Sequence, residues 1–153
     1  MSRAFVKELE DGVEELPERP ISPHPNLVTA EGLAHIEAEV TRLQQEHAAA
    51  HAANDRTALS RAARDLRYWT ARRATAQPVA APSDRSKVHF GSTVTIVRND
   101  GRRQSFRIVG EDEADPACGT LSQVSPLARA LFGKELGDTV KVAQSEAEIV
   151  EIA

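Results

Sequence analysis

The stretch Asn54-Asp55-Arg56-Thr57 lies between two helical patterns and decides how the first half of the chain folds. Asn and Asp favour turns because their side chains bond to nearby backbone, and either Asp55 or Thr57 can cap a new helix. Apolar residues recur at alternating spacings of three and four on both sides of this turn. These are Leu33, Ile36, Val40 and Leu43 before it, and Leu59, Ala62, Leu66 and Trp69 after it. We therefore predict an antiparallel coiled-coil hairpin over residues 27–77.

The ends of the predicted hairpin carry helix signals. Thr29 is a good N-cap for the first helix, and Pro78 stops the second. Toward the turn the first seam continues through small and polar residues, which predicts weak packing there; the second seam continues past Trp69 to Arg73. The first arm is rich in glutamate and the second in arginine, so ion pairs between the arms are available, each worth a few tenths of a kcal/mol.

The segments that flank the hairpin show no helical period. Residues 1–26 are acidic with repeated proline, which predicts a flexible tail because such a segment cannot bury enough apolar surface to fold alone. Phe5 and Val6 form an apolar pair near its start that could instead dock on a partner. Residues 78–86 are expected to be a linker.

Residues 87–153 change from helical to alternating patterns. Asn99-Asp100-Gly101 is a strong hairpin-turn signal, and Ser125-Pro126 supplies an N-cap and a proline at the first helical position. The expected strands include Val88 and Phe90 and the ranges 93–97, 104–109, 121–124, 138–142 and 148–152. The fold class is therefore α+β: a two-helix hairpin followed by an antiparallel β domain that wraps one short helix.

Composition favours a binding protein over an enzyme. The chain has 153 residues, and its net charge of −4 argues against simple adhesion to nucleic acid. Aromatic residues make up 4%, which is thin for an apolar ligand pocket. A single cysteine, Cys118, fits a reducing cytosol, and the sequence holds no signal-peptide region and no stretch long enough to span a bilayer. We expect a cytoplasmic protein with no membrane anchor.

Three runs of sequence resemble the bacterial Gre transcript-cleavage factors, the GreA/GreB family. They are residues 107–115 (RIVGEDEAD), residues 125–134 (SPLARALFGK) followed by Gly137-Asp138, and residues 27–33 (LVTAEGL). The resemblance covers about residues 27–153, whereas residues 1–26 have no counterpart in the standard factors. It is carried mainly by the C-terminal half.

This resemblance implies a specific partner and no cofactor. It implies that residues 87–153 adopt an FK506-binding-protein-like fold that docks at the mouth of the RNA polymerase secondary channel while the hairpin enters the channel. By the same resemblance Ser125, Pro126, Leu127 and Arg129 would contact polymerase. In the cleavage factors two acidic residues at the hairpin tip help hold a second Mg²⁺ at the polymerase active site, where it activates water.

The tip of this chain departs from that pattern. The matching run is Asn54, Asp55, Arg56, Thr57, Ala58, so Ala58 stands where the family has its second acid. One carboxylate is a poor anchor for Mg²⁺, and Asp55 is either a weak candidate ligand for a polymerase-held Mg²⁺ or a turn and cap residue. Each arm is also about ten residues shorter than in the full-length factors, which removes roughly 15 Å of reach.

We therefore expect a regulator of transcription elongation that binds polymerase, is no enzyme itself, and stimulates transcript cleavage weakly or not at all. It would act as a monomer. Arg61 and Arg64 could touch RNA or DNA phosphates, including nascent RNA, although pairing within the hairpin explains them equally well. The alternative is a relative of Rnk, the regulator of nucleoside diphosphate kinase, which has a reduced hairpin. A prolyl isomerase is a third possibility, but residues 78–153 supply only three phenylalanines for its pocket.

Other polar groups favour ordinary structural roles. His47 and His51 are four residues apart but have no evident third ligand, so no metal site is expected. The acidic residues at 111–115 are expected to form a solvated loop, because calcium-loop spacing is absent. Cys118 has no base motif nearby, and catalysis at its thiol is not expected.

Overall fold

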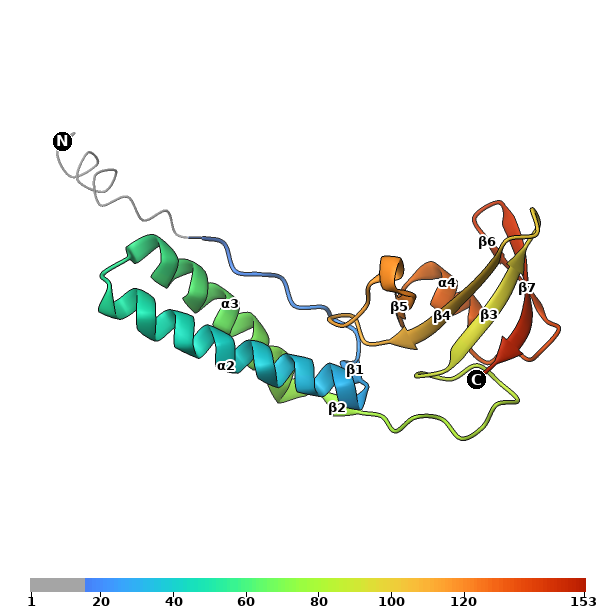
Figure 1. Cartoon of the computed structure of the whole chain (residues 1–153), viewed down its shortest axis with the longest axis horizontal. Helices are drawn as coiled ribbons and strands as arrows, with labels where there is room; N and C mark the ends of the chain where they lie inside the picture. The colour runs from blue at the N-terminus through green and yellow to red at the C-terminus, as the bar shows by residue number, and fades with distance from the viewer. Residues whose placement is uncertain (1–15) are drawn as a thin grey trace. The chain divides into compact units, whose positions relative to one another are not determined.

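The computed structural model describes residues 16–153, which fall into two compact units. One unit contains residues 16–23 and 35–75, and the other contains residues 24–34 and 76–153. Figure 1 shows two long helices in the first unit and a curved sheet in the second. None of the helices in the described part of the chain is both long and apolar enough to cross a membrane.

The first two helices form the predicted hairpin. Helix α2 spans Ala30–Ala52 and helix α3 spans Arg56–Thr75, and Figure 1 shows them lying side by side. Ile36, Val40 and Leu43 of the predicted seam are each 1% exposed. Burial of this apolar stripe provides most of the stability of such a hairpin, because helices of this length are marginal alone in water.

The second arm departs from the predicted seam near its end. Trp69 is buried and stands edge-on to the rings of His35 and Tyr68, with centroids 5.5 and 5.2 Å away. One turn further on, Arg72 is buried instead of the predicted Arg73, which is exposed. An α-helix turns every 3.6 residues and drifts relative to a 3.5-residue repeat, so a step of three keeps Arg72 on the buried face.

Several glutamates and arginines of the hairpin pair within their own arm. Arg42 pairs with Glu39 and Glu46 of the same helix, and Arg64 pairs with its neighbour Asp65. These are local contacts three, four or one residue apart, rather than the cross-arm pairs that the charge pattern made available.

Residues 16–26 form neither helix nor strand, yet their side chains have defined contacts. Glu18 pairs with Arg67, and Arg19 lies 3.5 Å from Asp65. Residues 1–15, including the apolar pair Phe5 and Val6, lie outside the described residues.

The hairpin begins and ends beside a short parallel ladder. Strand β1 (Leu27–Val28) pairs with strand β2 (Gln77–Pro78), and the N–H of Val79 donates to the carbonyl of Val28. The start of the predicted linker is therefore hydrogen-bonded to the strand that precedes α2. Thr29 caps α2 as predicted, since its hydroxyl accepts the N–H of Gly32 at 3.0 Å.

The C-terminal domain contains a five-stranded sheet. Its strands are β3 (Thr93–Arg98), β4 (Arg103–Val109), β5 (Thr120–Ser122), β6 (Thr139–Val142) and β7 (Ser145–Ile152), in the order β5-β4-β3-β7-β6. The predicted antiparallel β domain is confirmed except at β5, which runs parallel to β4 and makes the sheet mixed. The connection between them holds the short 3₁₀ helix η1 (Pro116–Cys118), which gives the chain room to return in the same direction. Val88 and Phe90 are buried but lie outside the strands.

Helix α4 (Pro126–Leu131) closes the core of this domain. Ser125 is its N-cap, accepting the N–H of Ala128 at 3.2 Å, as the Ser-Pro start predicts. Ala128 and Leu131 of α4 belong to the same buried cluster as Ile96, Ile108 and Ile149 of the sheet. The single α-helix thus supplies the apolar layer that the inner face of the sheet requires.

Candidate functional site

The hairpin tip is a tight connection in which Asp55 makes hydrogen bonds at the end of α2 and at the start of α3. Asn54 has a positive φ of 52°, and its N–H donates to the carbonyl of His51. The N–H of Asp55 donates to the carbonyl of Ala50, which completes a Schellman ending of α2. The Asp55 carboxylate then caps α3, because its Oδ1 accepts the N–H of Ala58 at 3.1 Å.

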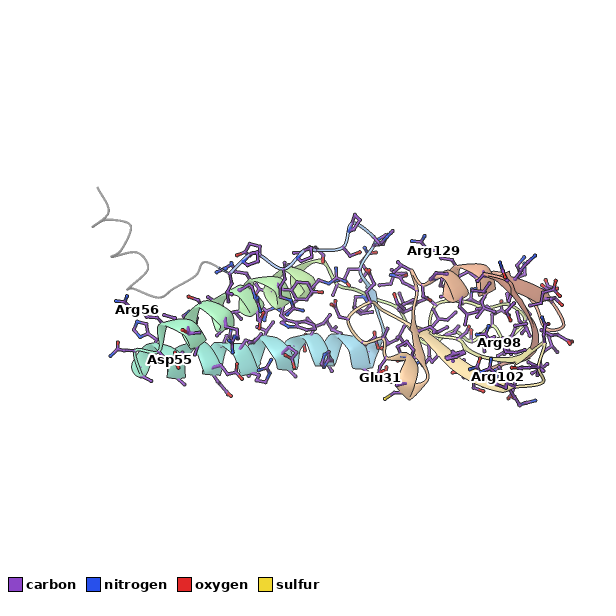
Figure 2. All side chains as sticks on the ribbon, turned by 90° about the horizontal axis from the view of Figure 1, so that it is seen from above. Glu31, Asp55, Arg56, Arg98, Arg102 and Arg129 are labelled. Atoms are coloured by element: carbon purple, nitrogen blue, oxygen red, sulfur yellow. The ribbon has the colours of Figure 1, made fainter. Side chains whose placement is uncertain are left out.

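This geometry limits what the tip can do with a metal ion. Figure 2 shows Asp55 and Arg56 at the end of the hairpin, where α2 meets α3. One carboxylate oxygen of Asp55 is engaged by the helix backbone, and Ala58 contributes no oxygen. Among residues 16–153 no group of three or more His, Cys, Asp or Glu side chains is placed to hold a metal ion. Asp55 is thus a helix cap first, and offers at most a single-carboxylate contact to an ion held by another molecule.

Two substitutions at Asp55 separate the contribution of its capping hydrogen bond to stability from that of its negative charge. Asp55→Ala removes the acceptor for an N-terminal N–H of α3, and we expect the free energy of unfolding to fall by about 1 kcal/mol. Asp55→Asn keeps a capping oxygen without the charge and should stay close to the parent chain. Urea denaturation followed by far-ultraviolet circular dichroism measures both. Equal losses in the two variants would show that the negative charge, rather than the cap, is what stabilises the tip.

A groove of about 390 Å³ lies between the arms just behind the tip. Alanines line most of it, as the small seam residues predict, together with the charged side chains of Glu46, Asp55, Arg61 and Asp65. Arg61 is exposed, whereas Arg64 is engaged with Asp65 at 3.1 Å. Of the two candidate nucleic-acid contacts, Arg61 is therefore the more accessible.

The second candidate surface surrounds α4. Pro126 and Arg129 are exposed and Ser125 is partly exposed, so these three side chains are available to a partner. Leu127 is not, because its side chain is 9% exposed and belongs to the core. The Arg129 Nη2 lies 3.5 Å from the His24 Nε2 of the segment before β1.

A structural contact that the sequence analysis did not predict joins the acidic loop to the start of α2. The Glu113 carboxylate accepts both the N–H and the hydroxyl of Thr29, and the N–H of Gly110 at 3.3 Å. It lies so close to Gly32 that a Cβ there would be 1.9 Å from Oε2. The prediction of a solvated loop is wrong for Glu113, which places negative charge at a helix N-terminus. The signal available in the sequence was a glycine in the first turn of a helix, where glycine is costly.

Glu31, in the first turn of α2, is held in its charged form. Hydrogen bonding to its own backbone N–H lowers the pKa of its carboxyl, and the nearby charge of Arg107 lowers it further. Glu31 and Arg107 belong to two of the sequence runs that resemble the Gre factors, and their side chains lie 3.5 Å apart. The family-like runs thus meet around the start of the hairpin.

The Cys118 thiol lies beside the Asp115 carboxylate. A hydrogen bond to Asp115 and the negative charge of that carboxylate raise the pKa of the exposed Cys118 thiol. A raised pKa lowers the thiolate fraction at neutral pH, and the thiolate is the reactive form.

Comparisons with known proteins agree with this architecture. The family model for the C-terminal part of transcription elongation factors GreA/GreB matches residues 82–153. A transcription elongation factor GreA of Legionella pneumophila is 33% identical over 159 residues, covering 86% of this chain and 97% of that protein. A GreA of Alkalilimnicola ehrlichii is 50% identical over 78 residues, which are 48% of this chain and 49% of that protein, so the match spans about half of that relative.

A solved structure also aligns with the chain. It is the GreA factor homolog 1 of Thermus thermophilus, with 21% identity, 85% coverage of this chain, 99% coverage of that chain and a TM-score of 0.42. The sequence matches are to one class of proteins, the transcription elongation factors. This chain belongs to the GreA/GreB family.

Proposed function

We propose that this chain is a regulator of transcription elongation that binds RNA polymerase and stimulates transcript cleavage weakly or not at all. The C-terminal domain docks at the mouth of the secondary channel, and the hairpin is inserted into the channel. The chain binds as a monomer, and Mg²⁺ is held by polymerase rather than by this protein. Hydrolysis is the chemistry of polymerase, so the chain is no enzyme itself.

The proposal of weak or absent cleavage stimulation rests on the hairpin tip. Two carboxylates acting together could complete the shell of a second Mg²⁺, which demands near-octahedral oxygen ligands. This tip supplies Asp55 alone, with one oxygen engaged by the N–H of Ala58. The docking part is better preserved, because the family model matches residues 82–153. Polymerase binding and cleavage are therefore separable in this chain.

One experiment with stalled polymerase complexes tests both halves of the proposal. The parent chain and Asp55→Asn are added to backtracked complexes, and release of short RNA is followed with time. We expect equally low cleavage with both proteins, because a cap-preserving change removes nothing that cleavage uses. Robust hydrolysis by the parent chain that is lost in Asp55→Asn contradicts the non-cleaving assignment.

Docking is measured in the same complexes by co-purification with core polymerase. Arg129→Glu reverses the charge of an exposed side chain on α4, and we expect at least about tenfold weaker binding, since like charges across an interface cost several kcal/mol. Arg102→Glu, an equal change at the exposed turn after β3, is the control. Equal losses would show that net charge rather than the α4 surface governs binding. Capture of nucleoside diphosphate kinase without polymerase would favour the Rnk-like alternative.

A further inference from the structure

Residues 16–19 lie against α3 in the same compact unit, and we call them the strap. The Glu18 carboxylate accepts hydrogen bonds from the Arg67 Nε at 2.9 and 3.0 Å, and another from Nη2. Their side chains are 64% and 55% exposed, so this pair lies at the surface. The guanidinium thus binds its carboxylate in the fork geometry with which arginine also binds phosphate.

The next residue of the strap covers an aromatic ring. The guanidinium of Arg19 lies 3.9 Å from the centroid of the Tyr68 ring and 5.7 Å from that of Trp69. Its Nη1 is also 3.5 Å from the Asp65 carboxylate. A planar cation over a ring face is a stacking contact of the cation–π type.

Arg67 and Tyr68 together present the two groups that single-stranded nucleic acid uses. Proteins bind such strands by pairing cations with the phosphates and by stacking bases on aromatic rings or arginine. The strap fills both places with its own side chains. The Glu18 carboxylate sits where a phosphate would pair, and the Arg19 guanidinium sits where a base would stack.

We propose that Arg67 and Tyr68 form a contact surface for single-stranded RNA, and that the strap occupies this surface in the free protein as an intramolecular competitor. The inference rests on the proposed function, in which the hairpin is inserted into the secondary channel of polymerase, and it names RNA as what α3 would contact there. It identifies a different surface from Arg61 and Arg64, and gives the segment before the hairpin a role in regulating it.

The strap is suited to be displaced. Exposed ion pairs contribute little to stability, so an RNA strand with several phosphates can outcompete one carboxylate. Prolines at 17, 20 and 23 restrict the backbone, which lowers the entropy lost on docking and keeps a weak contact populated. A hydrogen bond from Arg67 and the positive charges of Arg67 and Arg64 lower the pKa of Glu18, so its carboxylate is charged at neutral pH.

RNA binding by the full chain without polymerase tests the proposal. The probe is a fluorescein-labelled single-stranded RNA of about twelve nucleotides, read by anisotropy at low salt. Glu18→Gln removes the competing charge, and we expect about two- to fivefold tighter binding than the parent chain, the worth of one exposed ion pair. Glu37→Gln makes the same charge change at an exposed position of α2 and should bind as the parent chain does.

Arg67→Gln completes a double-mutant cycle. It should weaken RNA binding, and adding Glu18→Gln to it should have no further effect, because the site for which Glu18 competes is gone. Equal gains in Glu18→Gln and Glu37→Gln, or a Glu18→Gln gain that persists without Arg67, would overturn the competition. Absence of RNA binding by every variant would also overturn it, while leaving polymerase binding, measured separately, to decide the proposed function.

Discussion

Replacing Trp69 by alanine is expected to unfold the hairpin while the C-terminal domain stays folded. Trp69 is buried between the arms and packs edge-on against His35 of the facing helix. Its removal leaves a large cavity in the seam between the two arms. Truncations of this size cost about 3–5 kcal/mol. A two-helix unit has little other apolar burial to offset such a loss, so most of its stability disappears.

Amide hydrogen exchange followed residue by residue is the measurement that resolves this. In Trp69→Ala we expect protection to fall across α2 and α3 while β3 and β7 keep theirs, because residues 35–75 and 76–153 belong to separate compact units. Trp69→Phe is the matched control, since it keeps an aromatic ring in the seam and should lose much less. Loss of protection in both units at once would show that they fold as one cooperative body.

This variant also separates the two halves of the proposed function. Docking depends on the C-terminal domain, so Trp69→Ala should still co-purify with polymerase. Any effect on elongation that needs the inserted hairpin should be lost. A variant that lost docking as well would place part of the polymerase-binding surface on the hairpin.

Features with a local signal could be predicted from the sequence, and those made by distant residues could not. Spacings of three and four predicted the hairpin, and Asn54-Asp55 predicted its turn. Both features depend on residues that are close to one another in the sequence. Thr29 and Ser125 were predicted as caps for the same reason, and both accept a backbone N–H three residues on.

The features that the sequence did not predict depend on residues that are far apart in the chain. The direction of β5 depends on where a ten-residue connection returns, which no local pattern specifies. The partners of Glu18 and Glu113 lie 49 and 84 residues away in the sequence, so both residues resembled solvated charges. The resemblance also placed Leu127 among the polymerase contacts, whereas its side chain is buried between the exposed Pro126 and Arg129, as the apolar spacing of α4 predicts. The family resemblance named residues of α4 without separating the exposed side chains from the buried one.

Removing the contact between Glu113 and the start of α2 is expected to lower the stability of the protein strongly. Thr29 is 2% exposed, and its N–H and hydroxyl both donate to the Glu113 carboxylate. Glu113→Ala leaves these two buried donors without their acceptor and removes the negative charge at the helix N-terminus. Unsatisfied buried donors cost about 1–3 kcal/mol each, so we expect the free energy of unfolding to fall by about 2–6 kcal/mol. Urea denaturation monitored by circular dichroism measures this loss.

Gly32→Ala is a second test of this contact. Its expected effect on the free energy of unfolding is opposite in sign to that of most Gly→Ala changes in helices. Glycine inside a helix is less favourable than alanine by about 1 kcal/mol, so Gly→Ala in a helix usually stabilises. Here the new Cβ would lie 1.9 Å from the Glu113 Oε2 and must push the carboxylate off its donors. We therefore expect Gly32→Ala to destabilise the protein by nearly as much as Glu113→Ala.

The double variant decides between this mechanism and a general intolerance of side chains at position 32. With Glu113 already alanine, the three atoms that would lie nearest the new Cβ are gone, and the hydrogen bonds from Thr29 to the carboxylate are already lost. Gly32→Ala should then cost nothing further, and should recover part of the intrinsic preference of the helix for alanine. The two changes would be strongly non-additive, as contacting residues are. Additive losses would mean that Gly32 and Glu113 act independently, and that the carboxylate does not hold the first turn of the hairpin in place.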